Sequence, residues 1–289
     1  MHFWQPFTAA LAAAILLPWS VHAADTLGPA ALRARHAVIA PQLSGNAFGG
    51  PLVLQSEEVG RRIDGDVYAI VDHPYPAVAA ALRDPAQWCE ILILHLNTKY
   101  CRRQDTAAGG TRVDVRVGKK EPQSIRAATP LSFAWRKPQV LSDYLSVQME
   151  AAEGPYDTRD YRLLAEAMPL EGGRTFLHMG YAFSYGGASD MAMSLYLRTI
   201  GRDKVGFTRS GPDLVSGMRG VAERNTMRYY LAIDAYLDSL SAPVGQQLER
   251  RLRAWFDATE RYPRQLQEVG RDAYLRMKRE EVQRQATRG

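Results

Sequence analysis

The sequence predicts an α+β fold in which a curved antiparallel β-sheet is wrapped around a long C-terminal helix, with extra helices after it. Segments with period-two alternation of apolar and polar residues fill the middle of the chain. Glycine pairs at 109–110 and 172–173 separate two pairs of these segments, which is typical of antiparallel hairpins. The pattern then becomes helical over 217–240. The only large apolar surface that can bury this helix is the concave face of a twisted sheet.

The N-terminus has the pattern of a signal peptide over residues 1–23. Residues 7–19 are mostly apolar, and Val21-His22-Ala23 places small residues where a signal peptidase requires them. The apolar run is shorter than the roughly 20 residues of a membrane span. Residues 1–6 carry no Lys or Arg, so a retained helix is the alternative. We expect cleavage near Ala23 and a mature protein that is periplasmic or secreted.

Two cysteines remain after cleavage, Cys89 and Cys101. In an oxidising compartment a pair this close in sequence is expected to form a disulfide bond rather than stay free. A zinc site needs about four ligands, and neither a second Cys pair nor a His cluster stands in the sequence. We therefore expect no metal and no cofactor.

The elements before the main sheet are helical except for one hairpin. A short helix over 29–39 and a Pro/Gly loop over 41–51 lead to two strands, 52–57 and 65–72. Two short helices follow, the first starting at Pro74 and the second carrying Trp88 and Cys89 toward Leu94.

The remaining strands have one apolar and one polar face. We expect them at His95–Arg103, Thr111–Val117, Leu131–Arg136, Tyr144–Ala152, Arg159–Met168 and Arg174–Ser184. The apolar face carries Val113, Val115, Val117, Leu145, Val147, Met149, Leu163, Ala165, Ala167, Leu177, Met179, Tyr181 and Phe183. The opposite face carries Arg112, Asp114, Arg116, Ser146, Gln148, Glu150, Arg162, Glu166 and His178, and it should meet water or a covering segment.

Helices complete the chain. The segment Ser189–Lys204 is amphipathic and could be either a mobile lid or a fixed packing helix. Beyond Pro243 the pattern predicts helices over 248–261 and 263–284. The domain organisation we expect is a signal peptide (1–23), an N-terminal helix and loop (24–51), one domain (52–240) and a C-terminal helical extension (241–289).

The chain is basic, with a net charge of +5 and a pI near 9.2. The excess of Lys and Arg lies mainly in the last third, where acidic residues are interleaved as on a solvated helix. Peripheral contact of these helices with anionic lipid headgroups is the alternative. Export argues against nucleic acid as a partner. The basic residues are Arg250, Arg251, Arg253, Arg261, Arg264, Arg271, Arg276, Lys278 and Arg279.

Four segments resemble exported bacterial members of the START-like helix-grip (SRPBCC) superfamily. They are Gly65-Asp-Val-Tyr-Ala-Ile-Val, Pro74-Tyr-Pro-Ala-Val, Trp88-Cys-Glu-Ile-Leu and the start of the long helix at Gly217-Met-Arg-Gly-Val-Ala-Glu-Arg-Asn. The resemblance covers roughly 52–240, and no catalytic residue of the superfamily transfers to this chain. It implies a deep pocket between helix and sheet that holds a lipid or another hydrophobic small molecule.

The residues themselves also favour a cavity, because the inward face uses several small side chains that leave room. Asn225, Tyr181 and Tyr229 could hydrogen-bond a ligand or satisfy one another. Trp135 and Tyr144 are weaker candidates for the pocket mouth. The candidate ligand-binding residues are Val113, Val115, Val147, Met149, Leu163, Ala165, Leu177, Met179, Tyr181, Met218, Val221, Asn225 and Tyr229.

Catalysis has no motif to support it. His36, His73, His95 and His178 remain in the mature chain, none in a recognised catalytic setting. His95 is expected to be structural, and Glu150 with Glu166 is expected to be a solvated pair on the polar face. Ligand carriage is therefore the first hypothesis, an enzyme of the superfamily (cyclase- or hydrolase-like) the second, and a non-catalytic envelope scaffold the third.

Overall fold

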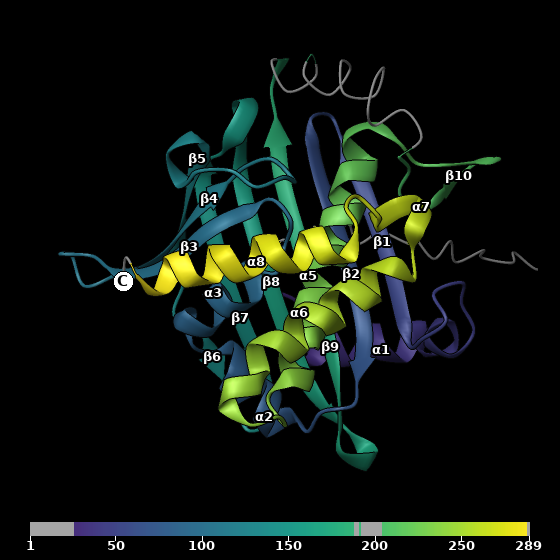
Figure 1. Ribbon diagram of the computed structural model, residues 1–289. Helices are drawn as coiled ribbons and strands as arrows, with labels where there is room; N and C mark the ends of the chain where they lie inside the picture. The colour runs from purple at the N-terminus through teal and green to yellow at the C-terminus, as the bar shows by residue number, and fades with distance from the viewer. Residues whose placement is uncertain (1–25, 188–190, 192–203, 288–289) are drawn as a thin grey trace, which may run out of the picture.

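A nine-stranded antiparallel sheet forms the centre of the computed structural model, which describes residues 26–187, 191 and 204–287 (Figure 1). The predicted signal peptide and almost all of the segment 189–204 lie outside the described residues. The main path of the sheet runs β1-β2-β9-β8-β7-β5-β4-β3, and β6 pairs with β7. The strands are β1 (Leu52–Val59), β2 (Arg62–Val71), β3 (Thr98–Asp105), β4 (Thr111–Val117), β5 (Thr129–Trp135), β6 (Gln139–Val140), β7 (Leu145–Glu153), β8 (Thr158–Leu170) and β9 (Arg174–Tyr185). A separate small hairpin is formed by β10 (Arg209–Ser210) and β11 (Asp213–Leu214).

The long helix α5 (Gly217–Ser239) lies against one face of the sheet, and the predicted helix-grip architecture is confirmed (Figure 1). It packs closely on β2, where a Cβ built on Gly65 would lie 2.6 Å from Thr226 Oγ1. A side chain at this position would meet Thr226, so the threonine or the helix would have to shift. The inward register of the strands and the apolar residues of α5 form one large core.

Burial of α5 extends nearly all round, beyond the single stripe that the sequence predicts. The second cover is α6 (Val244–Glu260), which packs along α5 on the side away from the sheet. Glu223, Arg224 and Arg228 are buried although they are charged; the first two contact residues 205–208, and the third contacts Leu266 and Glu268.

Two short helices, α2 (Tyr75–Leu82) and α3 (Pro85–Leu92), close one end of the sheet. Asp84 caps α3 by accepting a hydrogen bond from the backbone N–H of Ala86 at 2.9 Å. The predicted disulfide is confirmed, and Cys89 and Cys101 tie α3 to β3 with their Cα atoms 5.2 Å apart. Structural disulfides are typical of proteins in an oxidising compartment.

The tail contains a break that the sequence analysis missed. The predicted helix over 263–284 is in fact α7 (Pro263–Leu266) and α8 (Arg271–Ala286), separated by a short loop that ends at Gly270. Leu266 before the break and Tyr274 after it are both buried. Helix α8 lies across β3 and α6 (Figure 1).

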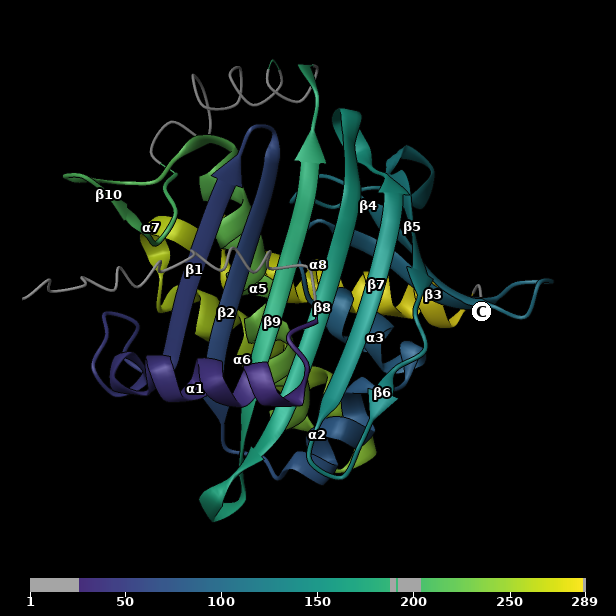
Figure 2. The same ribbon diagram turned by 180° about the vertical axis from the view of Figure 1, so that it is seen from behind.

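The outer face of the sheet is covered by α1 (Pro29–Ser44), which lies across β1, β2 and β9 in Figure 2. A second, smaller core forms beneath it, with Leu32, Ile39 and Leu43 from the helix packed on Tyr68 and Phe176. The polar register of the sheet thus meets a covering segment over part of its area. Within the described ranges, none of the helices has both the length and the apolar character that crossing a bilayer requires.

Candidate functional site

A cavity of about 400 Å³ lies between the sheet and the N-terminal half of α5. Strands β4, β5, β8 and β9, the turn before β3 and the turn before β8 supply its other walls. Most of the lining is apolar or aromatic, with a few polar groups, which is the usual composition of a small-molecule site. The lining residues are His95, Asn97, Val117, Leu131, Phe133, Pro155, Tyr156, Thr158, Tyr161, Tyr181, Phe183, Met218, Val221, Asn225 and Tyr229.

The thirteen ligand-binding residues named from the sequence divide into two groups. Five of them line the cavity: Tyr181, Met218, Val221, Asn225 and Tyr229. The other eight are buried in the main core and do not line it: Val113, Val115, Val147, Met149, Leu163, Ala165, Leu177 and Met179. Contact with a ligand stays a prediction for all thirteen residues, and the second group packs in the core behind the cavity wall.

Sequence reasoning missed much of the cavity wall. Val117 and Phe183 were placed on the inward face but not chosen, and Tyr161 in β8 was not noticed. The period-two alternation of their strands could have identified Val117 and Phe183 as candidates. Of the weaker candidates, Trp135 packs against Trp88 at 6.4 Å between ring centroids. Tyr144 lies in the small core under α1, so its placement at a pocket mouth is wrong.

An aromatic wall follows one side of the cavity. The ring of Tyr161 stacks on that of Phe183 with centroids 5.6 Å apart, and Tyr181 lies 5.5 Å from Phe183 and 5.4 Å from Tyr229. Burial raises the pKa of Tyr161, Tyr181 and Tyr229, so all three keep their protons at neutral pH. The wall therefore offers flat apolar surfaces edged with neutral hydroxyl groups.

His95 forms one polar end of the cavity. It lies in the turn before β3 rather than in the strand predicted there, it is 3% exposed, and its ring stacks on Tyr229 at 5.0 Å. The backbone N–H of Asn97 donates to His95 Nδ1 at 3.1 Å, so the ring proton lies on Nε2. Among the described residues no hydrogen bond of ordinary geometry reaches Nε2, although the side chain of Asn225 interacts with the ring and raises its pKa.

Cationic side chains lie next to His95 on the side away from the cavity. Lys278 of α8 donates to the backbone oxygens of His95 at 2.6 Å and Thr98 at 2.8 Å. Lys278 and Lys99 share the carboxylate of Glu281, with all three side chains fully buried. Burial, followed by the charges of Arg228 and Lys278, holds the pKa of His95 well below its usual value, so the ring is neutral.

A second cluster of the same kind lies beside the first. Arg228 of α5 and Lys120 both contact Glu268, at 2.9 and 2.7 Å. Arg228 also donates to the backbone oxygen of Leu266 at 3.1 Å. Each cluster thus places two cationic side chains around one carboxylate.

The turn Pro155–Asp157 forms one edge of the cavity. Tyr156 is 75% exposed there, and Tyr156 and Asp157 both have the left-handed backbone conformation, with φ of 58° and 62°. Tyr161 donates a 2.6 Å hydrogen bond to Thr158, which in turn donates to the backbone oxygen of Pro155. Backbone conformations of this kind are sparsely populated and tend to cluster at functional sites.

A separate polar network lies on the outer face under α1, where a solvated Glu150–Glu166 pair was expected. That expectation is wrong for Glu166, which is fully buried and accepts from Tyr144 and from the backbone N–H of Leu27 at 2.9 Å. His178 bridges Glu166 at 2.8 Å and Asp66 at 2.7 Å. These two carboxylates raise the pKa of His178 to about 9 although burial alone would lower it. The network holds the N-terminal segment onto the sheet.

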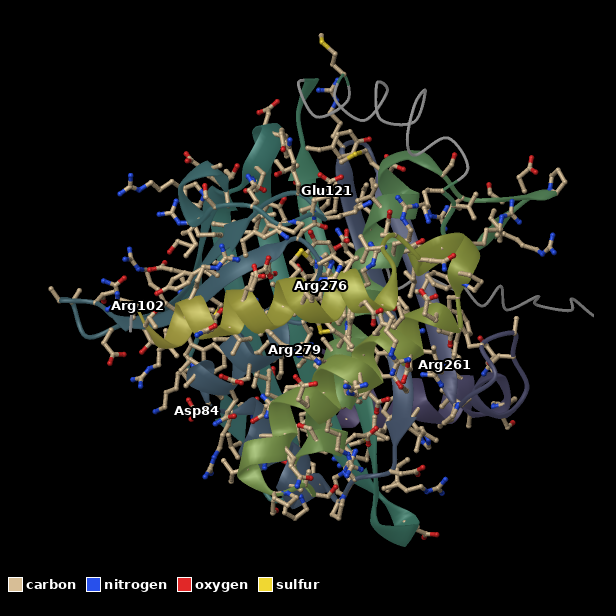
Figure 3. The ribbon with its side chains drawn as sticks, in the orientation of Figure 1. Asp84, Arg102, Glu121, Arg261, Arg276 and Arg279 are labelled. Atoms are coloured by element: carbon tan, nitrogen blue, oxygen red, sulfur yellow. A yellow bond between two sulfur atoms is a disulfide. The ribbon has the colours of Figure 1, made fainter. Side chains whose placement is uncertain are left out.

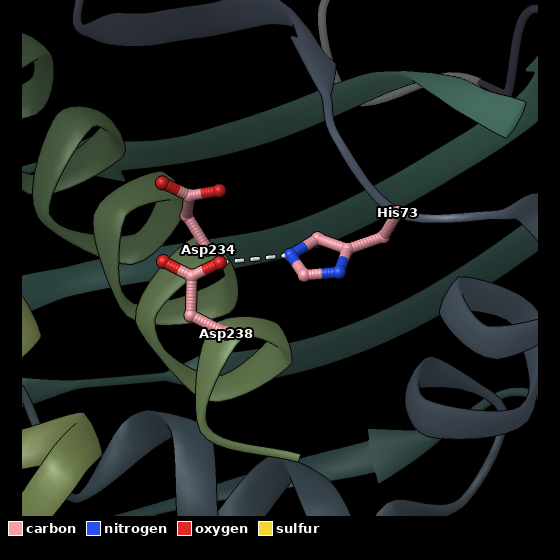
Figure 4. A group of neighbouring side chains, drawn as sticks. All are labelled: His73, Asp234 and Asp238. Carbon is pink, nitrogen blue, oxygen red and sulfur yellow. Dashed lines mark hydrogen bonds and ion pairs between the residues drawn. The ribbon is translucent and has the colours of Figure 1, made fainter. Parts of the chain in front are cut away.

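His73, Asp234 and Asp238 form a third cluster, shown in Figure 4. Their ligand atoms lie within 4.8 Å of one another, and His73 Nε2 is 3.0 Å from Asp238. Burial and the charge of Asp238 raise the pKa of Asp234 to about 6. His73 and the nearby Arg261 act in the opposite direction and lower that pKa.

Several basic side chains of the C-terminal helices are buried or form ion pairs within the protein. Arg251 and Lys278 are buried, and Arg271 and Arg279 form ion pairs with Asp257 and Glu249. Figure 3 shows Arg276 and Arg279 over the outer side of α8.

Comparison with known proteins gives similarity at the level of structure only. No protein-family model matches the chain, and no curated protein matches its sequence. The Zhui aromatase/cyclase from a Streptomyces species is similar with 13% identity and a TM-score of 0.34, over 70% of this chain and 95% of that one. Human StAR-related lipid transfer protein 5 is similar with 12% identity and a TM-score of 0.32, over 60% and 91%. A norcoclaurine synthase point mutant from Thalictrum flavum is similar with 12% identity and a TM-score of 0.34, over 66% and 98%. Likeness at this level says nothing about the ligand or activity of this chain.

Proposed function

We propose that this protein is an exported binding protein that holds a lipid or another hydrophobic small molecule in the cavity between α5 and the sheet. The observation that carries the proposal is the cavity itself, about 400 Å³ bounded mostly by apolar and aromatic side chains. A pocket of this size and lining falls in the range of small-molecule sites. The disulfide and the N-terminal sequence pattern support export, to the periplasm or beyond the cell.

The volume limits the ligand. If each methylene group takes about the 30 Å³ that a water molecule occupies in the liquid, about 400 Å³ holds on the order of a dozen of them. One alkyl chain or a compact ring system therefore fits, whereas a phospholipid with two full chains would extend out of the cavity. Membrane contact by the basic helices stays a prediction, in which Arg251 and Lys278 take no part because they are buried.

The test is native mass spectrometry of the mature protein purified without detergent, before and after incubation with a membrane lipid extract. We expect a hydrophobic adduct at one molecule per chain. Val221→Trp should abolish it, because Val221 lines the cavity and the indole would fill the space. Val244→Trp is the matched control, since Val244 is 85% exposed on α6 and the same substitution leaves the cavity intact.

An unchanged apo mass for the wild type after incubation would overturn the proposal. It would favour the scaffold role, or an enzyme with a small polar substrate.

A further inference from the structure

We propose that the ligand of this cavity is amphipathic and presents an anionic oxygen, such as a carboxylate, to His95 Nε2. This inference rests on the proposed function and specifies the class of molecule bound. It is carried by a buried hydrogen-bond donor in the cavity wall and by the charges around that donor.

The first step concerns the donor. Because a backbone N–H can only donate, the 3.1 Å contact from Asn97 requires His95 Nδ1 to be the acceptor, which leaves the proton on Nε2. His95 is 3% exposed, and within the described part of the chain no hydrogen bond of ordinary geometry reaches Nε2, although Asn225 interacts with the ring. A buried donor without a partner is costly, so a ligand that supplies an acceptor recovers that cost on binding.

The second step concerns the charge that the acceptor carries. Lys278 contacts the backbone oxygen of His95 directly, and it shares one carboxylate with Lys99. Arg228 and Lys120 share the carboxylate of Glu268 on the same side. The potential at the His95 end is therefore positive, which favours an anionic group there and disfavours an ammonium group.

The third step concerns the rest of the ligand. The rest of the lining includes the apolar side chains of Phe133, Phe183, Met218 and Val221, and none of its residues carries a charge. The site thus has one end next to positive charge, and the rest of its lining is uncharged and mostly apolar or aromatic. An unbranched carboxylate of about a dozen carbons matches both the polarity and the volume.

The test compares three ligands with the same chain: dodecanoate, dodecanol and dodecylammonium. Each is titrated against the full mature protein loaded with Nile red, a neutral hydrophobic fluorophore, and displacement gives its affinity. We expect dodecanoate to bind roughly tenfold tighter than dodecanol, as a hydrogen bond to a charged group allows, and dodecylammonium to bind weakest. His95→Phe keeps the aromatic ring beside Tyr229 and removes the donor, so it should abolish the preference for dodecanoate while Nile red still binds.

A second measurement avoids the folding of a variant. Histidine ¹⁵N NMR of the wild type should show His95 as the neutral tautomer protonated at Nε2, and dodecanoate should shift the Nε2–H resonance. Equal affinities for the three ligands, with no shift at His95, would overturn the inference and leave the proposed function standing. Failure of Nile red and of all three ligands to bind would instead count against the proposed function.

Discussion

Replacing His178 by Asn should make the stability of the protein less dependent on pH between 6 and 10. The imidazole lies between Glu166 at 2.8 Å and Asp66 at 2.7 Å, and these carboxylates raise its pKa from 6.5 to about 9. A raised histidine pKa means that the folded state binds the proton more tightly than the unfolded state. The resulting stabilisation is complete below the unfolded pKa and is lost as the pH rises through about 9.

The magnitude follows from the size of the shift. With 1.36 kcal/mol for each pKa unit, protonation of His178 contributes about 3 kcal/mol at pH 6, about 1.5 kcal/mol at pH 8 and close to zero at pH 10. Lys278, whose pKa burial lowers to about 8, acts in the opposite direction, but it is present in both proteins and cancels in their difference.

The assay is urea unfolding of the wild type and His178→Asn at pH 6, 8 and 10, followed by circular dichroism. The free-energy difference between the two should shrink by about 3 kcal/mol from pH 6 to pH 10. His36→Asn is the control, because His36 packs edge-on against Phe176 beside the network, and no ion pair joins it to a carboxylate among the described residues. A difference that stays constant with pH would refute the assignment of a protonated His178.

Three further predictions concern stability. Replacing both Cys89 and Cys101 by Ser should lower the free energy of unfolding by about 3 kcal/mol, as expected for a closed loop of this length. Urea unfolding of the oxidised wild type and the double mutant measures this, and an unchanged urea midpoint would contradict it. Asp234→Asn should raise the melting temperature at pH 8 but not at pH 4, because ionising this half-buried carboxyl, whose pKa is about 6, costs up to about 3 kcal/mol above that pH. Equal effects at both pH values would contradict this. Gly65→Ala should destabilise the protein by about 1–3 kcal/mol through the clash with Thr226. Adding Thr226→Ala should restore part of the lost stability. A double mutant no more stable than Gly65→Ala alone would show that the clash with Thr226 is not the cause.

The arrangement of strands and the long helix could be predicted because their signals are local. Period-two alternation in β4, β7, β8 and β9 is a property of each segment by itself, as is the helical spacing of α5. The disulfide follows from two cysteines twelve positions apart in a sequence with a secretory pattern. The break before α8 escaped notice because the apolar spacing continues through Gly270.

The site was harder to predict because it depends on contacts between distant segments. Alternation identifies the inward face of the sheet but not where facing side chains leave space, so Met149 and Met179 were chosen alongside Tyr181 although they fill the core. The burial of Glu166 depends on backbone N–H groups 138 and 139 residues away. The sequence predicted only a structural role for His95. That its Nε2 makes no ordinary hydrogen bond among the described residues, and that the residue lines the cavity, can be seen only in the folded structure.

The most direct measurement is a crystal structure of the mature protein incubated with a membrane lipid extract. Our account predicts continuous density for one hydrophobic molecule between α5 and β9, with its polar end against His95. A cavity that contains only water, or one closed by the inward movement of Met218 and Phe133, would contradict the claim that this protein binds a hydrophobic ligand there.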